Sequence, residues 1–164
     1  ILGLLGPMVV LPKVEQDIPY KDVMFVLQQW ELPQTKKGEI NPGVYRPEKF
    51  DIQPNFFTIN GKAFPSTDPV YTNYGEKLRM RFVNKSSASH SMHVHGHDFK
   101  VVEIDGFPRN NWLDTINVPS GRRASIEFIS NNPGRWPING TKTFHQTNNG
   151  VTPGGMITRL LYNN

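Results

Sequence analysis

Short segments in which apolar and polar residues alternate recur along the chain, and turn-forming residues close each of them. Residues 77–84, KLRMRFVN, alternate apolar and basic side chains, as a strand with one buried face does. The sequence holds 14 glycines and 14 prolines, and no segment keeps a helical period beyond a turn or two. Several short strands separated by such turns predict an all-β domain, an antiparallel sandwich with Greek-key connections.

The expected strands follow one another along the chain. Residues 33–54 have the proline, glycine and charge content of a long surface loop, and Asn60-Gly61 is a strong hairpin signal. One continuous strand is expected over 91–106, ending in a turn at Asp105-Gly106. The other expected strands lie in 7–12, 22–32, 56–61, 77–84, 114–121, 123–130 and 155–163.

Size and charge limit the classes of function. A chain of 164 residues has room for one domain with a sizeable core. The formal net charge is +4, but no basic run alternates with stacking aromatic residues, which argues against a nucleic-acid partner. No stretch approaches the length of a membrane span. The absence of cysteine excludes disulfides and thiolate metal ligands from this chain.

Four of the five histidines lie within HSMHVHGHDF, residues 90–99. Alternate side chains of a strand share a face, so His93, His95 and His97 are expected to point one way and His90 the other. Imidazole is the commonest nitrogen ligand for copper, zinc and iron. The pattern predicts a metal site, and its alternative is a set of exposed or hydrogen-bonded histidines that bind no metal.

This stretch resembles the motif H-x-x-H-x-H-G-H-x-F of the last cupredoxin domain of multicopper oxidases. The matching residues are His90, His93, His95, Gly96, His97 and Phe99. Residues 101–106, 114–136 and 148–162 are also similar to strands of that family. The resemblance implies a cupredoxin-like Greek-key β-sandwich over 21–164. It further implies that residues 1–12 are the closing strand of a preceding cupredoxin domain and that 13–20 are a linker.

The resemblance also implies a role for each histidine. It assigns His90 to a type 1 copper, His93 to the type 2 ion and His95 to a type 3 ion of a copper cluster. It implies that His145 is the second imidazole ligand of the type 1 copper and that Met156 is its axial ligand. His97 is expected to support a ligand rather than to bind the ion itself.

The chain departs from the family at its second motif, W-x-x-H-C-H-x-x-x-H. Residues 136–145 read WPINGTKTFH, so Asn139, Gly140 and Thr141 stand where the His-Cys-His triplet is expected. A blue copper site needs a thiolate, and the triplet also carries the usual electron route to the cluster. We therefore expect a copper-binding domain that is inactive alone, a fragment or oligomer in which another cupredoxin domain or subunit completes the cluster.

Alternatives of different classes remain open at this point. The parent reaction implied by the resemblance is oxidation of a phenol, an amine or a metal ion coupled to reduction of dioxygen. A second interpretation is a non-enzymatic cupredoxin scaffold for interaction or for copper storage and delivery. A third is a mononuclear zinc or copper site at His93 and His95, with His97 as a further candidate. The resemblance implies a periplasmic or secreted protein.

Overall fold

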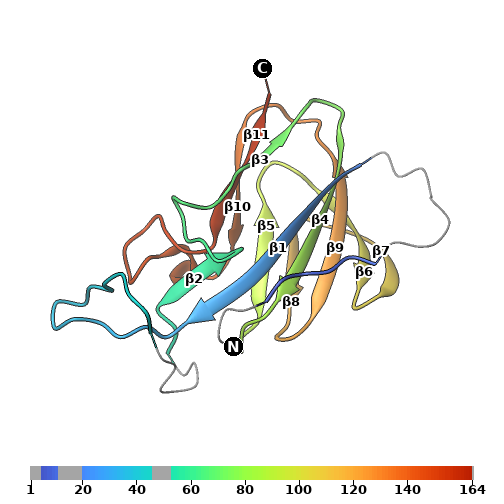
Figure 1. Cartoon of the computed structure of the whole chain (residues 1–164). Coiled ribbons are helices and arrows are strands. Elements are labelled where there is room, and N and C mark those ends of the chain that lie inside the picture. The colour runs from blue at the N-terminus through green and yellow to red at the C-terminus, as the bar shows by residue number, and fades with distance from the viewer. Residues whose placement is uncertain (1–4, 11–19, 46–52, 164) are drawn as a thin grey trace.

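Two packed β-sheets make up the domain in the computed structural model, which describes residues 5–10, 20–45 and 53–163 (Figure 1). The first sheet has the strand order β2 (Phe56–Ile59), β1 (Lys21–Trp30), β4 (Lys77–Asn84), β9 (Arg123–Ile129), β6 (Phe99–Ile104) and β7 (Phe107–Leu113). The second has the order β3 (Val70–Thr72), β11 (Ile157–Tyr162), β10 (Arg135–Gly140), β5 (His90–Val94) and β8 (Thr115–Val118). A 3₁₀ turn, η1 (Thr143–Gln146), follows β10. The predicted cupredoxin-like Greek-key β-sandwich is confirmed.

The sheets are mixed rather than wholly antiparallel. Strand β1 runs parallel to β4 and β11 runs parallel to β3, while the other pairs are antiparallel. After β1 and β2 the chain crosses to the second sheet at β3 and returns at β4, and a strand that returns by such a crossover can run parallel to its neighbour. The expectation of an entirely antiparallel sandwich was wrong for these two pairs.

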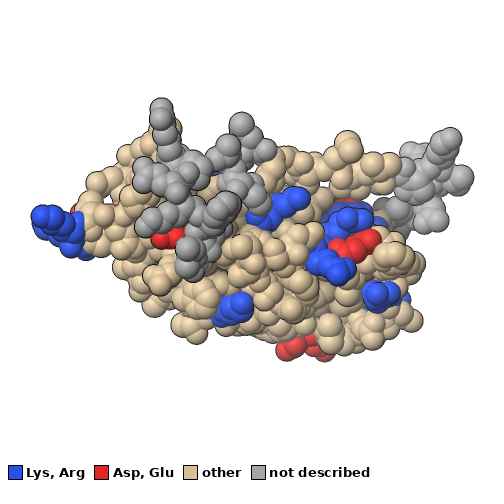
Figure 2. All heavy atoms as spheres, turned by 90° about the horizontal axis from the view of Figure 1, so that it is seen from below, with Lys and Arg blue, Asp and Glu red and all other residues tan. Residues whose placement is uncertain are grey.

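The core lies between the sheets, and β4 shows how the sequence builds it. Leu78, Met80 and Phe82 are fully buried, as the alternation predicted. Arg79, on the opposite face, pairs with Glu127 of the neighbouring β9. Basic and acidic side chains are interspersed on the surface seen in Figure 2 rather than gathered into one basic region.

The continuous strand expected over 91–106 is two strands in different sheets. Strand β5 ends at Val94 and β6 begins at Phe99. Between them Gly96 has a φ of 71°, and a Cβ at this position would lie 2.8 Å from ring atoms of Trp136. A residue with a side chain would therefore be strained there and would also collide with the indole. The expectation was wrong because this glycine ends the alternation of the strand.

The predicted hairpin is present, but three of the observed strands were not predicted. Asn60 and Gly61 both have positive φ, as the hairpin signal predicted. Strands β3, β7 and β10 were not predicted; β7 is exposed along its whole length and therefore has no alternating pattern.

No helix in the described part of the chain is long and apolar enough to span a membrane.

The division of the N-terminal region stays a prediction. Residues 5–10 belong to no strand, and residues 1–4 and 11–19 lie outside the described part of the chain. Strand β1 begins at Lys21, where the cupredoxin domain was expected to start.

Candidate metal centre

His90 and His145 face each other in the interior of the sandwich. His90 is the first residue of β5 and His145 lies in η1, and both side chains are fully buried. Their Nδ1 atoms are 3.1 Å apart. This separation suits a hydrogen bond between neutral imidazoles, and it equally suits two nitrogens on one ion, because metal–nitrogen bonds are about 2.0–2.1 Å long.

The remaining nitrogens of the two rings differ in their surroundings. His90 Nε2 shares a hydrogen bond of 2.8 Å with the Ser86 hydroxyl. His145 Nε2 is buried, and no polar atom of the described residues reaches it. The rings of Phe57 and Phe144 pack against His145, with centroid separations of 4.7 and 4.3 Å. The pocket is thus largely apolar around one imidazole and offers a hydroxyl to the other.

Both imidazoles are neutral at physiological pH. Burial, followed by the proximity of His145 and Lys142, lowers the pKa of His90 to about 3. Burial and Lys142 lower the pKa of His145 to about 4. A neutral imidazole has a lone pair for a metal ion, so protons do not compete with metal in this pocket.

Met156 is held beside His145 by backbone contacts. Its N–H donates to the His145 carbonyl at 2.7 Å, and its own carbonyl accepts from the Gly140 N–H at 3.0 Å. The preceding Gly155 has a φ of 59°, and a Cβ there would overlap the His145 carbonyl oxygen. A glycine therefore allows the segment to return this closely to η1.

Gly140 lies at the position where the resemblance led us to expect a cysteine. A Cβ built on it would be 3.7 Å from His145 Nδ1 and 3.8 Å from Met156 Cβ, both ordinary van der Waals distances. A side chain at residue 140 would thus fit and would begin beside His145 and Met156. The structure thus places Gly140 beside His145 and Met156, and His145 faces His90. The assignment of these residues to a copper site stays a prediction.

His93 and His95 form a second group on the other side of β5. The burial of β5 alternates, so His90 points inward and His93 is partly exposed. The rings of His93 and His95 have a centroid separation of 4.5 Å. His93 donates its Nδ1–H to the Asp114 carbonyl at 2.7 Å. Its Nε2 is left as the atom that carries a lone pair, an arrangement typical of metal-ligating histidines.

His95 is engaged by the residue that replaces one of the expected histidines. Its Nε2–H donates to Asn139 Oδ1 at 2.8 Å. The amide is oriented by its own Nδ2, which donates to the Gly140 carbonyl at 3.1 Å. A carbonyl oxygen can only accept, so this contact fixes which end of the amide faces His95. His95 Nε2 therefore carries a proton and has no lone pair for a metal ion.

His97 has both ring nitrogens bound within the fold. It donates Nδ1–H to the His95 carbonyl at 3.0 Å, and its Nε2 accepts from the Tyr162 hydroxyl at 2.7 Å. The expected common face with His93 and His95 was wrong, because the turn at Gly96 intervenes. His97 instead holds the backbone next to His95.

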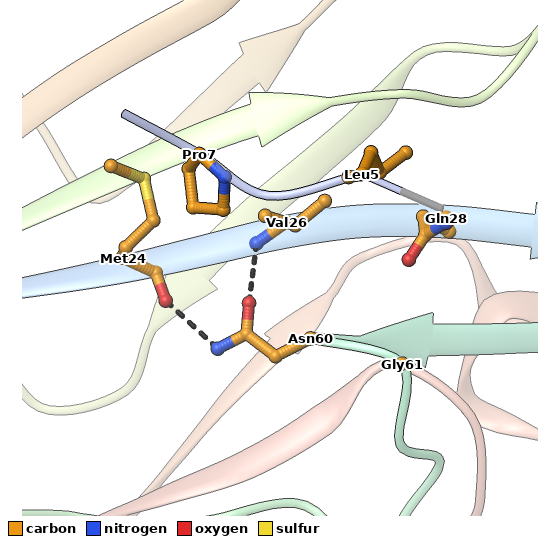
Figure 3. Close-up of a pocket in the computed structure, with 7 residues that line it drawn as sticks. All are labelled: Leu5, Pro7, Met24, Val26, Gln28, Asn60 and Gly61. Carbon is orange, nitrogen blue, oxygen red and sulfur yellow. Dashed lines mark hydrogen bonds between the residues drawn. The ribbon is translucent and has the colours of Figure 1, made fainter. Parts of the chain in front are cut away.

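The described residues contain no group of three His, Asp or Glu side chains close enough to hold an ion. Each of the two histidine pairs therefore falls short of a site made from such side chains alone. A cavity of about 300 Å³ lies elsewhere, between Leu5 and Pro7 and the residues of β1 and the β2 turn (Figure 3). No histidine lines this cavity.

Sequence reasoning missed three groups that fix these imidazoles: Ser86, Tyr162 and the carbonyl of Asp114. Each bonds a ring nitrogen across a loop or between strands. Ser86 and Tyr162 had no signal in the sequence, because their contacts depend on how distant segments meet.

Comparison with known proteins decides the family. The sequence model described as "Multicopper oxidase" matches residues 39–152, most of the chain. The chain belongs to the multicopper oxidase family. It is 31% identical over 106 residues to the multicopper oxidase MmcO of Mycobacterium tuberculosis, covering 65% of this chain and 20% of that protein. It is 31% identical over 111 residues to laccase-6 of Arabidopsis thaliana, covering 57% of this chain and 19% of the laccase.

The fold of a solved multicopper oxidase agrees. The blue copper oxidase of Nitrosomonas europaea superposes with a TM-score of 0.79 at 29% identity, over 96% of this chain and 49% of that one. The chain spans about a fifth of the length of the two curated relatives. Copper is the metal that membership of the multicopper oxidase family implies. The buried imidazole pair fits a copper ion, but the chain has no thiolate to make that ion a blue copper centre.

Proposed function

We propose that this multicopper oxidase domain binds one copper ion at His90, His145 and Met156 without a thiolate, and does not catalyse oxidation by itself. The observation that carries this proposal is the pair of buried Nδ1 atoms 3.1 Å apart, next to a glycine in place of the expected cysteine. Two imidazoles and a thioether are ligands that copper accepts. Both imidazoles are already deprotonated and need no proton release before they bind an ion.

The second histidine group supports only a partial role in a copper cluster. His93 has Nε2 available, whereas His95 Nε2 is bonded to Asn139. Any cluster at this face needs further histidines from another cupredoxin domain or subunit. In a complete family member, bound copper would supply one-electron redox chemistry for oxidation of a phenol, an amine or a metal ion coupled to reduction of dioxygen.

Three coincident replacements, at Asn139, Gly140 and Thr141, support a non-enzymatic alternative. At the face of His93 and His95, the hydrogen bond between His95 and Asn139 occupies a ring nitrogen that would otherwise be available to a metal ion. A cupredoxin scaffold used for interaction or for copper storage and delivery would need no route for electrons. An oxidase domain would consume dioxygen in the presence of a reduced substrate, whereas a scaffold would not.

The proposal extends to the context of the domain. In a larger assembly, residues 1–12 would be the closing strand of a preceding cupredoxin domain and residues 13–20 a linker, although residues 5–10 form no strand in this chain. The partner is a second cupredoxin domain or subunit. The location proposed for the domain, from the family resemblance alone, is periplasmic or secreted.

Copper content and oxygen uptake test this proposal together. After dialysis against copper, the protein should retain one ion per chain, and His90→Ala combined with His145→Ala should abolish retention. The matched control is His97→Gln, because His97 is bonded within the fold rather than free to bind. With a phenol or with ferrous iron, the copper-loaded protein should consume oxygen no faster than the same substrate does in buffer without protein. Retention that survives the double substitution, or rapid oxygen uptake, would overturn the proposal.

A further inference from the structure

We propose that the pocket of His90, His145 and Met156 selects cuprous copper over divalent ions, because glycine at position 140 leaves it without a negative charge. This inference rests on the proposed copper site and concerns its oxidation state. A type 1 site of the family places a thiolate where Gly140 lies. Here the ligands are all neutral.

The absence of a negative charge among the described side chains of the pocket favours a monovalent ion over a divalent one. The side chains of His90, His145 and Met156 are fully buried. The free energy cost of burying an ion rises steeply with its charge unless an opposite charge lies beside it. A divalent ion would keep two uncompensated charges in this pocket, whereas a cuprous ion would keep one.

The charged group that acts on both imidazoles is a cation. Lys142, next to η1, acts electrostatically on His90 and on His145. Its ammonium is held in place by the Ser89 carbonyl, to which Nζ donates at 2.9 Å. Within the described part of the chain, the hydrogen-bond and ring contacts of the two imidazoles come from Ser86, from aromatic rings and from each other, and none is a carboxylate. A fixed positive charge nearby disfavours a divalent ion more than a monovalent one.

The chemistry of the ligands points the same way. A thioether and imidazoles are soft or intermediate donors, and soft sulfur ligands select Cu(I). Zinc and cupric ions would need a fourth ligand, commonly water, to complete their coordination. Phe57 is buried against the His145 ring, so one side of the pocket is closed to water. A cuprous ion is satisfied by few neutral ligands and therefore fits this pocket.

Competition between metals tests the selection. Under anaerobic conditions with reductant, the protein should take Cu(I) from a chromogenic chelator at one ion per chain. The same protein in oxidising buffer should bind Cu(II) and Zn(II) at least about tenfold more weakly, because neither finds an anionic ligand. Met156→Leu should weaken Cu(I) binding at least about tenfold, since even the outer partners of metal ligands contribute that much. Met80→Leu removes a thioether that is buried in the core away from the site and should leave binding unchanged.

A restored anion tests the physical cause. Gly140→Asp should shift the preference toward Cu(II) and Zn(II), whereas Gly140→Asn, of the same size but neutral, should not. Far-ultraviolet circular dichroism establishes that each variant is folded. Equal or tighter binding of Cu(II) or Zn(II) by the original protein would overturn the selection but leave the copper site intact. Failure to bind copper in either oxidation state would overturn the site itself, and the selection with it.

Discussion

Asn139 Oδ1 accepts the Nε2–H of His95 at 2.8 Å, so the residue that replaces one expected ligand also occupies another. The amide cannot be turned around without losing its contact with the Gly140 carbonyl. An asparagine where the resemblance implies a histidine therefore has two effects at this face. It removes a ligand, and it protonates the nitrogen that His95 would otherwise present.

Removal of this amide should free His95. In Asn139→Ala the ring has no acceptor at Nε2, so the proton should distribute over both nitrogens. Nitrogen-15 spectra in alkaline buffer should show His95 as the Nε2–H tautomer in the original protein and as a mixture in the variant. Asn117→Ala is the matched control, because Asn117 lies on the neighbouring β8 and bonds Ser91 rather than a histidine. A mixture already present in the original protein would contradict the assignment.

The turn between the third and fourth motif histidines should be intolerant of a side chain. Gly96→Ala adds backbone strain and a collision with Trp136, so we expect the free energy of unfolding to fall by about 3 kcal/mol or more. Gly61→Ala is the control, because Gly61 has a similar φ of 78° but open space around its Cβ position. Its cost should be about 1 kcal/mol, from the backbone alone. Urea unfolding measures the free energy of unfolding of both variants. Equal decreases would show that the Trp136 indole moves aside without an energetic cost.

Stability should fall as the solution is acidified below neutrality. The unfolded imidazoles of His90 and His145 protonate near pH 6.5, whereas in the fold burial keeps their pKa values at about 3 and 4. Lowered pKa values contribute stability that is complete above pH 6.5 and is lost as the pH falls toward 4. Each histidine should contribute a slope of about 1.4 kcal/mol per pH unit.

Unfolding measured at a series of pH values in the absence of metal checks this slope. The variant His145→Gln removes one titrating group and should reduce the slope over this range. The double variant with His90→Gln should reduce it further. A free energy of unfolding that is the same at neutral pH and at mildly acidic pH would mean that the imidazoles are not held neutral.

From the sequence alone, the orientation of the motif histidines could be predicted for His90, His93 and His95 but not for His97. Strand alternation placed His90 on one face and His93 and His95 on the other, as observed in β5. It failed at His97, because alternation holds only while the strand continues and Gly96 ends it. Turn residues likewise predicted the Asn60-Gly61 hairpin, but nothing local marked the exposed edge strand β7.

The partners of the imidazoles could not be predicted from the sequence. The contact of His95 with Asn139 depends on the pairing of β5 with β10, strands that are far apart in the sequence. Ser86 and Tyr162 reach His90 and His97 from a loop and from the last strand. These contacts are properties of the register between strands, which local patterns do not specify.

The absorption spectrum of copper-loaded Gly140→Cys, recorded beside those of the original protein and Gly140→Ser, tests whether the pocket lacks only a thiolate. A Cβ at residue 140 already fits beside His145 and Met156. We therefore expect an intense blue band in the cysteine variant alone. An intense band in the original protein, or a folded and copper-loaded cysteine variant without one, would contradict this expectation.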